Sequence, residues 1–237
     1  MKYQAIVFDL FGTLVDNFSL REHEAVLRQM AAVLSVPPEG FARMWGETFN
    51  KRATGAFRNT KDNTEYICQR LEVRPKDECL KLAVKIRVDF TRRSLKPRDD
   101  ALETLTQLIQ EGYIIGLISD CSSEVPLLWP DTPFAPLIHA VVFSCTVRLM
   151  KPDARIYRLA CEQLGVKPQE CLYVGDGSSH ELTGASRVGM HAVLIRVPYE
   201  DTSDAHRINA EEWNGPTVSA VREVVGLLDG INHNGSI

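Results

Sequence analysis

Near its start the chain contains the segment Ala5-Ile6-Val7-Phe8-Asp9-Leu10-Phe11-Gly12-Thr13-Leu14-Val15-Asp16. It begins as a continuous apolar run, which is typical of a strand buried on both faces of a parallel sheet. The run ends on the carboxylate of Asp9, and Gly12 and Thr13 then turn the chain away. Ligands of open α/β sheets bind beyond the carboxyl ends of the strands, so this position predicts a chemical role for Asp9. The alternative is that Asp9 only caps a turn.

The length and composition are those of an ordinary globular protein. A chain of 237 residues, 44% hydrophobic and 24% charged, fits one large α/β domain or a core domain with a smaller insert. The net charge of −4 argues against a dedicated nucleic-acid or anionic-membrane binder. No apolar run approaches the roughly 18 residues that span a bilayer, and no signal-peptide pattern precedes the first strand. Because the six cysteines form no CxxC pair and lie mostly in apolar contexts, we expect free thiols in a cytoplasmic protein.

Residues 17–95 predict an all-helical insert after the first strand. Apolar residues recur at helical spacing over residues 19–34, and Pro37-Pro38 then interrupts the pattern. Further helices are predicted over residues 41–49, 63–71 and 76–95, with a polar, basic loop over residues 50–60. Since no convincing strand lies in this region, residues 17–95 are predicted to form a helical cap domain. Residues 1–16 and 96–237 are predicted to form the core domain.

From residue 96 onwards, helical and strand patterns alternate. Buried strands are predicted over residues 113–119, 139–144, 171–176 and 191–195, and helices over residues 101–111, 154–164, 181–188 and 218–228. Strands that alternate with helices imply right-handed crossovers and a parallel sheet. The predicted fold class is therefore α/β, with a Rossmann-like, doubly wound parallel sheet and an inserted helical domain.

Reactive side chains lie at or near the ends of the predicted strands: Asp9, Ser119, Lys151 and Asp176. Some of them have a structural explanation, since Ser119 can satisfy a backbone group and Lys151 can be a solvated charge. Parallel strands bring their carboxyl ends to one edge of the sheet, which favours a joint role. A carboxylate there can act as a nucleophile when it is held in line and partly desolvated. Asp9 and Asp176 would also offer the hard oxygen ligands that Mg²⁺ prefers.

The order and local sequences of these segments resemble the haloacid dehalogenase-like hydrolase superfamily. The resemblance is carried by four motifs: Asp9-Leu10-Phe11-Gly12-Thr13, Leu117-Ile118-Ser119, Lys151-Pro152-Asp153, and Gly175-Asp176 followed by Glu181. The last acid is usually an Asp, and Glu181 together with Ser178 also fits a helix capping box. The resemblance covers the whole chain, because the helical insert matches the position of that superfamily's C1-type cap.

The resemblance implies a hydrolase with Asp9 as its nucleophile and Mg²⁺ as its cofactor. The implied catalytic residues are Asp9, Thr13, Ser119 and Lys151, and the implied metal ligands are Asp9, the Phe11 backbone carbonyl, Asp176 and Glu181. Lys151 would neutralise Asp9 and the transferred group, while Ser119 and Thr13 would hold phosphoryl oxygens. Glu181 would bind the metal through water or orient Lys151. Candidate substrate-binding residues in the core are Phe11, Gly12 and Asp120, and the expected partner is a small anionic molecule bound by a monomer or homodimer.

At position 11 the chain differs from the phosphatases of this superfamily in a residue that bears on catalysis. Phosphatases of this superfamily have there an Asp that acts as general acid, and loss of a general acid typically costs about 10²–10⁴ in rate. A phosphatase would need a leaving group that requires little protonation, or an acid from the substrate or cap. The superfamily's 2-haloacid dehalogenases also lack this Asp but work without metal, whereas Gly175-Asp176 is the phosphatase-like form. A third interpretation, a binding protein without catalysis, is disfavoured by the intact Asp9, Lys151 and Asp176. The favoured prediction is a Mg²⁺-dependent phosphohydrolase of a small phosphorylated metabolite.

The basic loop of the cap is the best candidate to reach this site. Within it, Arg52 is positioned to bind an anionic substrate group. The two linkers, near residues 15–18 and 95–97, would act as hinges that exclude water on closure. The alternative is that Lys51 and Arg52 are only solvated.

Overall fold

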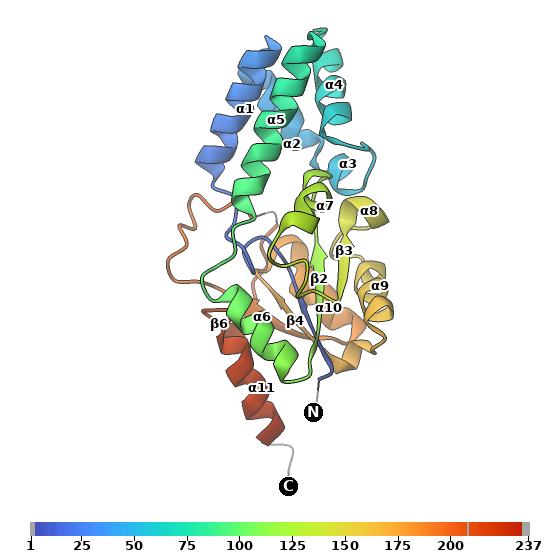
Figure 1. Ribbon diagram of the computed structural model, residues 1–237, viewed down its shortest axis with the longest axis vertical. Helices are drawn as coiled ribbons and strands as arrows, with labels where there is room; N and C mark the ends of the chain where they lie inside the picture. Colours follow the sequence, from blue (N-terminus) through green and yellow to red (C-terminus); the bar gives the residue numbers. More distant parts are fainter. Residues whose placement is uncertain (1–2, 208, 234–237) are drawn as a thin grey trace.

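A computed structural model of the chain describes residues 3–207 and 209–233. Its centre is a six-stranded parallel sheet with the strand order β3-β2-β1-β4-β5-β6 (Figure 1). The strands are β1 (Ala5–Phe8), β2 (Ile114–Ser119), β3 (Ala140–Phe143), β4 (Cys171–Gly175), β5 (His191–Ile195) and β6 (Thr217–Val218). The predicted α/β fold class with a Rossmann-like, doubly wound parallel sheet is therefore confirmed.

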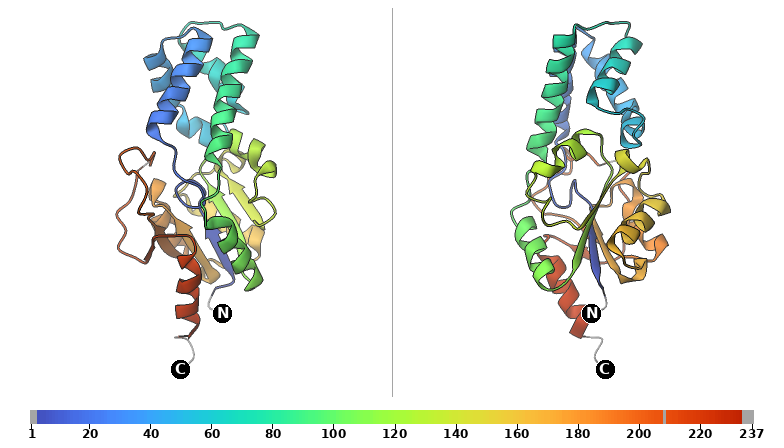
Figure 2. Two further views of the ribbon diagram at one scale, coloured as in Figure 1. Left: turned by 60° about the vertical axis from the view of Figure 1, so that its left-hand side comes forward. Right: turned by 45° about the vertical axis from the view of Figure 1, so that its right-hand side comes forward.

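Helices cover both faces of the sheet (Figure 2). On one side, α6 (Ala101–Gln110) and α11 (Glu223–His233) share a hydrophobic core with Ile6 and Phe8 of β1. On the other side, α9 (Ala154–Leu164) and α10 (Glu181–Val188) pack with Ala5 and Val7. Because neighbouring residues of a strand point to opposite faces, β1 needs an apolar residue at every position, and all four of its residues are buried.

A bundle of helices lies between β1 and β2 in the chain and stands beyond the carboxyl ends of the strands (Figures 1 and 2). Its members are α1 (Leu20–Leu34), α2 (Pro38–Glu47), α3 (Phe49–Ala53), α4 (Thr60–Arg70) and α5 (Asp77–Ser94). The bundle has a hydrophobic core of its own, to which Met30, Trp45 and Phe90 contribute. Local signals begin these helices: the Ser19 side chain accepts a hydrogen bond from Glu22 N, and Asn59 does the same for Asp62 N.

Several short elements differ from the sequence prediction. Residues 49–53 form the short helix α3, whereas the sequence predicts a loop from residue 50 onwards. Residues 217–218 form the edge strand β6, and the last helix begins at Glu223 instead of residue 218. Elements of two to five residues are too short to display a hydrophobic period, so only tertiary packing reveals them. The remaining short helices are α7 (Glu124–Leu128), α8 (Ser144–Val147), η1 (Trp129–Asp131), η2 (Pro168–Glu170) and η3 (Ser178–His180).

None of the helices within residues 3–207 and 209–233 combines the length and the apolar character needed to cross a membrane.

Candidate active site

The neighbouring strands β1, β2 and β4 bring the predicted reactive residues to one edge of the sheet. Phe8 is in register with Leu117 of β2 and Val174 of β4, so Asp9 emerges beside Ser119 and Asp176. All three side chains are buried, at 5%, 1% and 0% exposure. Three polar groups without access to water must find partners among themselves or in a ligand.

Lys151 supplies the cation at the centre of this cluster. Its Nζ donates to Asp9 Oδ1 at 2.6 Å and to Glu181 Oε2 at 2.5 Å. Burial lowers the pKa of Lys151, but the two carboxylates outweigh it and hold that pKa well above its ordinary value. Lys151 is therefore a permanent ammonium ion, and the interpretation of a solvated surface lysine is wrong. Burial raises the pKa of Asp9, Lys151 lowers it and Asp176 raises it, which leaves the pKa of Asp9 above its ordinary value.

Glu181 is held from three directions. Its Oε2 accepts from Lys151 and from the Tyr173 hydroxyl at 2.7 Å, and its Oε1 accepts from Gly177 N at 2.9 Å. The close approach of the Glu181 carboxylate to the end of β4 needs a glycine at position 175, because a Cβ there would lie 2.3 Å from Glu181 Oε1. These contacts favour the second of the two roles expected for Glu181, the orientation of Lys151.

Asp176 is held in its ionised form. Burial raises its pKa, but hydrogen bonds from Asn17 and Ser178 and the charge of Arg207 outweigh this and leave the pKa below its ordinary value. Asn17 Nδ2 and Arg207 Nε both contact Asp176 Oδ2, at 3.0 and 2.8 Å, while Ser178 N donates to Oδ1 at 3.0 Å. Arg207 also pairs with Glu200, so one guanidinium compensates two carboxylates.

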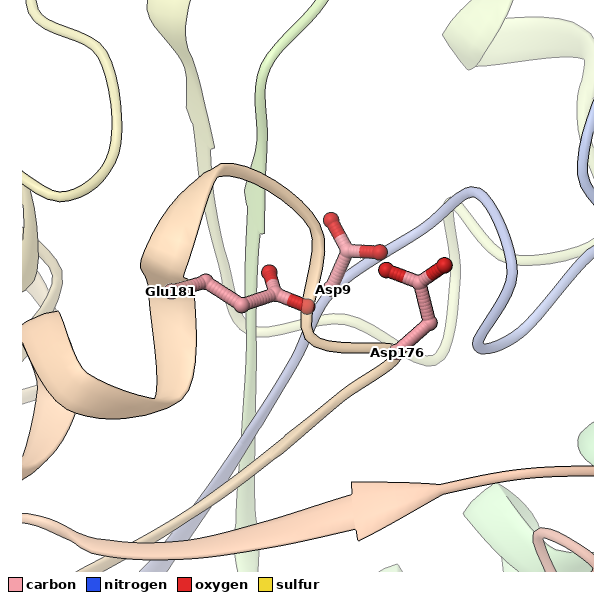
Figure 3. Close-up of side chains that lie close together, drawn as sticks. All are labelled: Asp9, Asp176 and Glu181. Atoms are coloured by element: carbon pink, nitrogen blue, oxygen red, sulfur yellow. The ribbon is translucent and has the colours of Figure 1, made fainter. Parts of the chain in front are cut away.

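The donor set suits a hard divalent cation such as Mg²⁺. Asp9, Asp176 and Glu181 each place one carboxylate oxygen within 4.8 Å of the others, and Figure 3 shows the three side chains converging. Carboxylate oxygens are the ligands that Mg²⁺ takes in proteins. Gly12 lets the backbone pass close to the Asp176 carboxylate: its φ is +83°, and a Cβ there would lie 2.5 Å from Asp176 Oδ2. Of the three, Asp9 has the fewest competing hydrogen-bond donors among the described residues, Lys151 and Thr13, so it is the best placed to hold the ion.

Two hydroxyls complete the floor of the site. Thr13 Oγ1 donates to Asp9 Oδ2 at 3.3 Å, so the hydroxyl expected to hold a phosphoryl oxygen contacts Asp9 in this structure. Ser119 Oγ is buried and has no partner within the described residues. A buried hydroxyl without a partner costs stability. A hydrogen bond from Ser119 Oγ to a substrate oxygen would satisfy this group.

A cavity of about 540 Å³ extends from Asp9 into the helical bundle. Its walls combine core and bundle residues, among them Phe11, Phe18, Trp45, Arg52, Arg87, Asp120 and Lys151. The Phe11 ring packs against Phe18, with 4.5 Å between ring centroids. Phe11 therefore forms part of an aromatic wall between the core and the first helix of the bundle.

Arg52 lies on α3 and lines this cavity, although it is only 6% exposed. Its Nη1 donates to Trp45 O at 2.5 Å and to Thr48 Oγ1 at 2.7 Å, while its Nε has no partner within the described residues. Burial and the neighbouring Arg87 lower the pKa of Arg52 to about 9, which leaves it charged at neutral pH. The expectation of a loop position is wrong, and so is the interpretation of a solvated Arg52.

A buried ion pair joins the bundle to the core beside the cavity. Arg87 Nε of α5 lies 3.6 Å from Glu124 Oε1 of α7, and both side chains are buried. Arg87 Nη1 also lies 3.1 Å from His23 Nδ1. Burial, with help from Arg87, lowers the pKa of His23 to about 3, so His23 is neutral under ordinary conditions.

Sequence reasoning missed several residues of the site. Asn17 directly follows the segment 5–16 that carries the first motif, so its place near the site was readable in principle, although its contact with Asp176 was not. Arg207 comes from a polar loop more than thirty residues after Asp176 and carries no local signal. Arg87 belongs to an apolar stripe of α5 whose partner in the core only the folded chain reveals.

Comparison with known proteins agrees with this geometry. Residues 3–189 match the family model described as haloacid dehalogenase-like hydrolase. The chain belongs to the haloacid dehalogenase-like hydrolases. Curated relatives of this family include (S)-2-haloacid dehalogenase 4A from Burkholderia cepacia, 28% identical and covering 89% of this chain and 93% of that protein. Another is a glyceraldehyde 3-phosphate phosphatase from Methanopyrus kandleri, also 28% identical, covering 81% of this chain and 84% of that protein.

Solved structures share the same fold. A phosphatase of this family from Thermococcus onnurineus superposes with a TM-score of 0.67 at 22% identity, over 96% of this chain and 98% of that one. This similarity shows the fold. Because the curated relatives include both a dehalogenase and a phosphatase, the family membership leaves the substrate class open.

Proposed function

We propose that this hydrolase uses Asp9 as its nucleophile and acts as a Mg²⁺-dependent phosphohydrolase of a small phosphorylated metabolite. The observation that carries the proposal is the buried cluster of Asp9, Asp176 and Glu181. The cations that contact it within the described residues are Lys151 and Arg207, and Arg207 is shared with Glu200. Negative charge in such excess is costly in a buried site unless a further cation compensates it. A phosphoryl group adds still more negative charge, which favours a metal ion as the compensating partner.

The residues of the chain have separate roles in this proposal. A carboxylate oxygen of Asp9 attacks phosphorus, while the ammonium group of Lys151 neutralises negative charge on Asp9 and on the transferred phosphoryl group. The hydroxyls of Ser119 and Thr13 donate to phosphoryl oxygens. Glu181 keeps Lys151 in position through the 2.5 Å contact. When bound, Mg²⁺ would be held by Asp9, Asp176 and the Phe11 backbone carbonyl, and it would supply positive charge to the transferred group.

We further propose that residues 17–95 act as a cap that selects the substrate. The cavity is walled by both parts of the chain, so a bound molecule would be enclosed and shielded from water. The guanidinium groups of Arg52 and Arg87 both line this cavity, and the one carboxylate that pairs with Arg87 and whose charge also acts on Arg52 is Glu124. This positive balance, with the partnerless Nε of Arg52 among the described residues, suits a substrate that carries an anionic group at the end remote from Asp9.

Replacing Arg52 with alanine should raise KM about 10–100-fold and change kcat much less. The reason is that a charge-assisted hydrogen bond to substrate contributes about 1.5–3 kcal/mol to binding. The measurement is steady-state hydrolysis of the best phosphorylated substrate found in a metabolite screen. Arg28→Ala is the matched control, because Arg28 is an exposed cap arginine that pairs with Glu24 of its own helix. Unchanged kinetics of Arg52→Ala would remove Arg52 from the substrate site.

Two observations favour a second candidate, the hydrolysis of a carbon–halogen bond. Phe11 cannot donate a proton, and a halide leaves without one. Arg207 Nε, at 2.8 Å from Asp176 Oδ2, compensates the charge of Asp176 in the way a metal ion would. The dehalogenase among the relatives supports this alternative at the level of the family. A binding protein without catalysis is the third candidate, and it requires that no reaction depend on Asp9.

Metal dependence separates the first two candidates. We expect acetyl phosphate and p-nitrophenyl phosphate to be hydrolysed only with Mg²⁺, and EDTA to abolish the reaction. Arg207→Ala should then lower the Mg²⁺ concentration for half-maximal rate about tenfold, because one competing charge-assisted contact to Asp176, worth roughly 1.5 kcal/mol, is removed. Arg187→Ala, an exposed arginine on α10, serves as control. EDTA-resistant release of halide from a 2-haloacid that Arg207→Ala abolishes would instead establish the dehalogenase.

A further inference from the structure

The aromatic side chain at position 11 leaves the proposed reaction without a proton donor for the leaving oxygen. An alkoxide leaves slowly unless it is protonated as the bond breaks. The acid must therefore come from elsewhere in the cavity if ordinary alkyl phosphates are substrates. The described residues that line the cavity offer one group that meets the requirements of geometry and acidity together.

That group is Asp120, which directly follows Ser119 at the tip of β2 and lines the cavity with Asp9 and Phe11. Lys151 N donates to Asp120 Oδ1 at 3.1 Å, which fixes the carboxyl group. Asp120 Oδ2 is buried and has no partner within the described residues. Because Oδ1 is already occupied by a donor, a proton on this carboxyl group resides on Oδ2. Two consecutive side chains, Ser119 and Asp120, thus present unsatisfied polar atoms at the same strand end.

The surroundings of Asp120 favour a transferable proton near neutral pH. Burial raises the pKa of Asp120, the charge of Lys151 and the hydrogen bond from its backbone lower it, and the charge of Asp9 raises it, to about 6 in balance. The other titratable groups whose charge interacts with it are Cys121 and Tyr157, both buried and both with a pKa raised by burial. A general acid is most effective when its pKa lies near the working pH.

Other titratable groups of the cavity wall are not suited to donate a proton to the leaving oxygen near neutral pH. Burial lowers the pKa of His23, to about 3, and also that of His206, so both imidazoles are neutral and hold no acidic proton. The neighbouring carboxylates keep the pKa of Lys151 far above neutrality. The side chain of Glu47 is 57% exposed and is engaged by Arg43 at the surface of α2.

We propose that Asp120 is the general acid and base of this hydrolase, in place of the acid missing at position 11; this rests on the proposed phosphohydrolase function. In the first step a carboxylate oxygen of Asp9 bonds to phosphorus and the bond to the leaving oxygen breaks. That oxygen keeps the electron pair and takes the Asp120 proton, so an alcohol departs. In the second step water attacks phosphorus, the bond to Asp9 breaks with its electron pair on Asp9, and Asp120 accepts a proton of the water. Inorganic phosphate is released and both side chains regain their starting forms.

The test compares leaving groups in wild type and Asp120→Asn, which keeps the acceptor for Lys151 N but cannot transfer the proton. On ethyl phosphate, whose alkoxide needs protonation, we expect kcat/KM to fall about 10²–10⁴-fold. On p-nitrophenyl phosphate, whose leaving group needs little protonation, the loss should stay below about tenfold. The wild-type rate on ethyl phosphate should also decline above about pH 6 as Asp120 ionises, and Asp120→Asn should lack that decline on the same substrate.

A rescue variant and a control sharpen the result. Phe11→Asp restores a carboxyl group at the other acid position, so Phe11→Asp/Asp120→Asn should regain activity on ethyl phosphate. Asp131→Asn, an exposed acid on η1, should leave the leaving-group dependence unchanged. An equal loss on both substrates, with an unchanged pH profile, would overturn the acid–base role while leaving the phosphohydrolase intact. Wild type inactive on every phosphate ester and acyl phosphate, with or without Mg²⁺, would overturn the proposed function and this assignment with it.

Discussion

Replacing Asp9 with asparagine should reduce turnover by at least about 10⁴-fold on every substrate of this protein. The change removes the attacking carboxylate, and loss of a nucleophile typically eliminates most of the rate acceleration. Asparagine has nearly the same shape, so the fold should survive. The folding stability should change little, because Asp9 loses the Lys151 pair but also its repulsion with Asp176. Activity assays together with circular dichroism and a thermal melt measure both effects.

The matched control for this experiment is Asp16→Asn. Asp16 lies in the same segment, but its side chain is 62% exposed and contacts Arg98 and Tyr199. We expect this control to keep the wild-type rate. The mass of purified Asp9→Asn must show that the amide has not hydrolysed back to the acid, and Asp9→Ala provides a second variant that cannot revert. A rate above about one tenth of wild type in both Asp9 variants would exclude Asp9 as the nucleophile.

Replacing Lys151 with methionine should affect stability and activity together. Methionine keeps the apolar stem but leaves Asp9 and Glu181 buried without their shared cation. Removing one partner of a buried ion pair typically costs about 3–5 kcal/mol in the free energy of unfolding. The uncompensated carboxylates would have a raised pKa in the folded state, so the folded protein would bind protons that the unfolded chain has released. Stability is then lost as pH rises, and the destabilisation should be larger at pH 8 than at pH 5.

Urea unfolding at the two pH values measures this effect. Lys81→Met is the control, because Lys81 is an exposed lysine of α5. Its free energy of unfolding should stay within about 0.5 kcal/mol of wild type. A Lys151→Met protein of wild-type stability would mean that Lys151 does not compensate the buried carboxylates. We also expect this variant to lose activity by roughly 10³-fold, since the transferred group loses its neighbouring charge.

The fold was predictable because its signals are local. The apolar run of residues 5–8 and the similar run of β2 indicate strands buried on both faces, and alternation with helices permits only a few topologies. The bundle was predictable as helical for the same reason, since a 3.6-residue period shows over any helix of three turns or more. α3 and β6 escaped prediction because they are shorter than one clear period.

The candidate site was predictable where a residue adjoins a strand end, or where it belongs to a motif that resembles the family's, as Lys151 and Glu181 do. Asp9, Ser119 and Asp176 end or follow strands whose parallel arrangement dictates their meeting. The sequence marks Arg52 as a charge within a basic segment, but its burial against Trp45 depends on how the bundle packs. The partners of Arg52, Arg87 and Arg207 therefore came from the folded chain.

The sequence by itself determined the parallel sheet, the helical insert and the edge of the sheet where the reactive residues meet. Hydrophobic periodicity and the order of strands and helices depend on residues that are close together in the chain, so they can be predicted without knowing the distant contacts. Only the tertiary structure decided which further charges compensate one another: Arg207 pairs with Asp176, and Arg87 with Glu124. It also left Asp120 with an oxygen that no described residue contacts. Ionisation depends on burial and on charges a few ångströms away, and these distances join residues far apart in the chain.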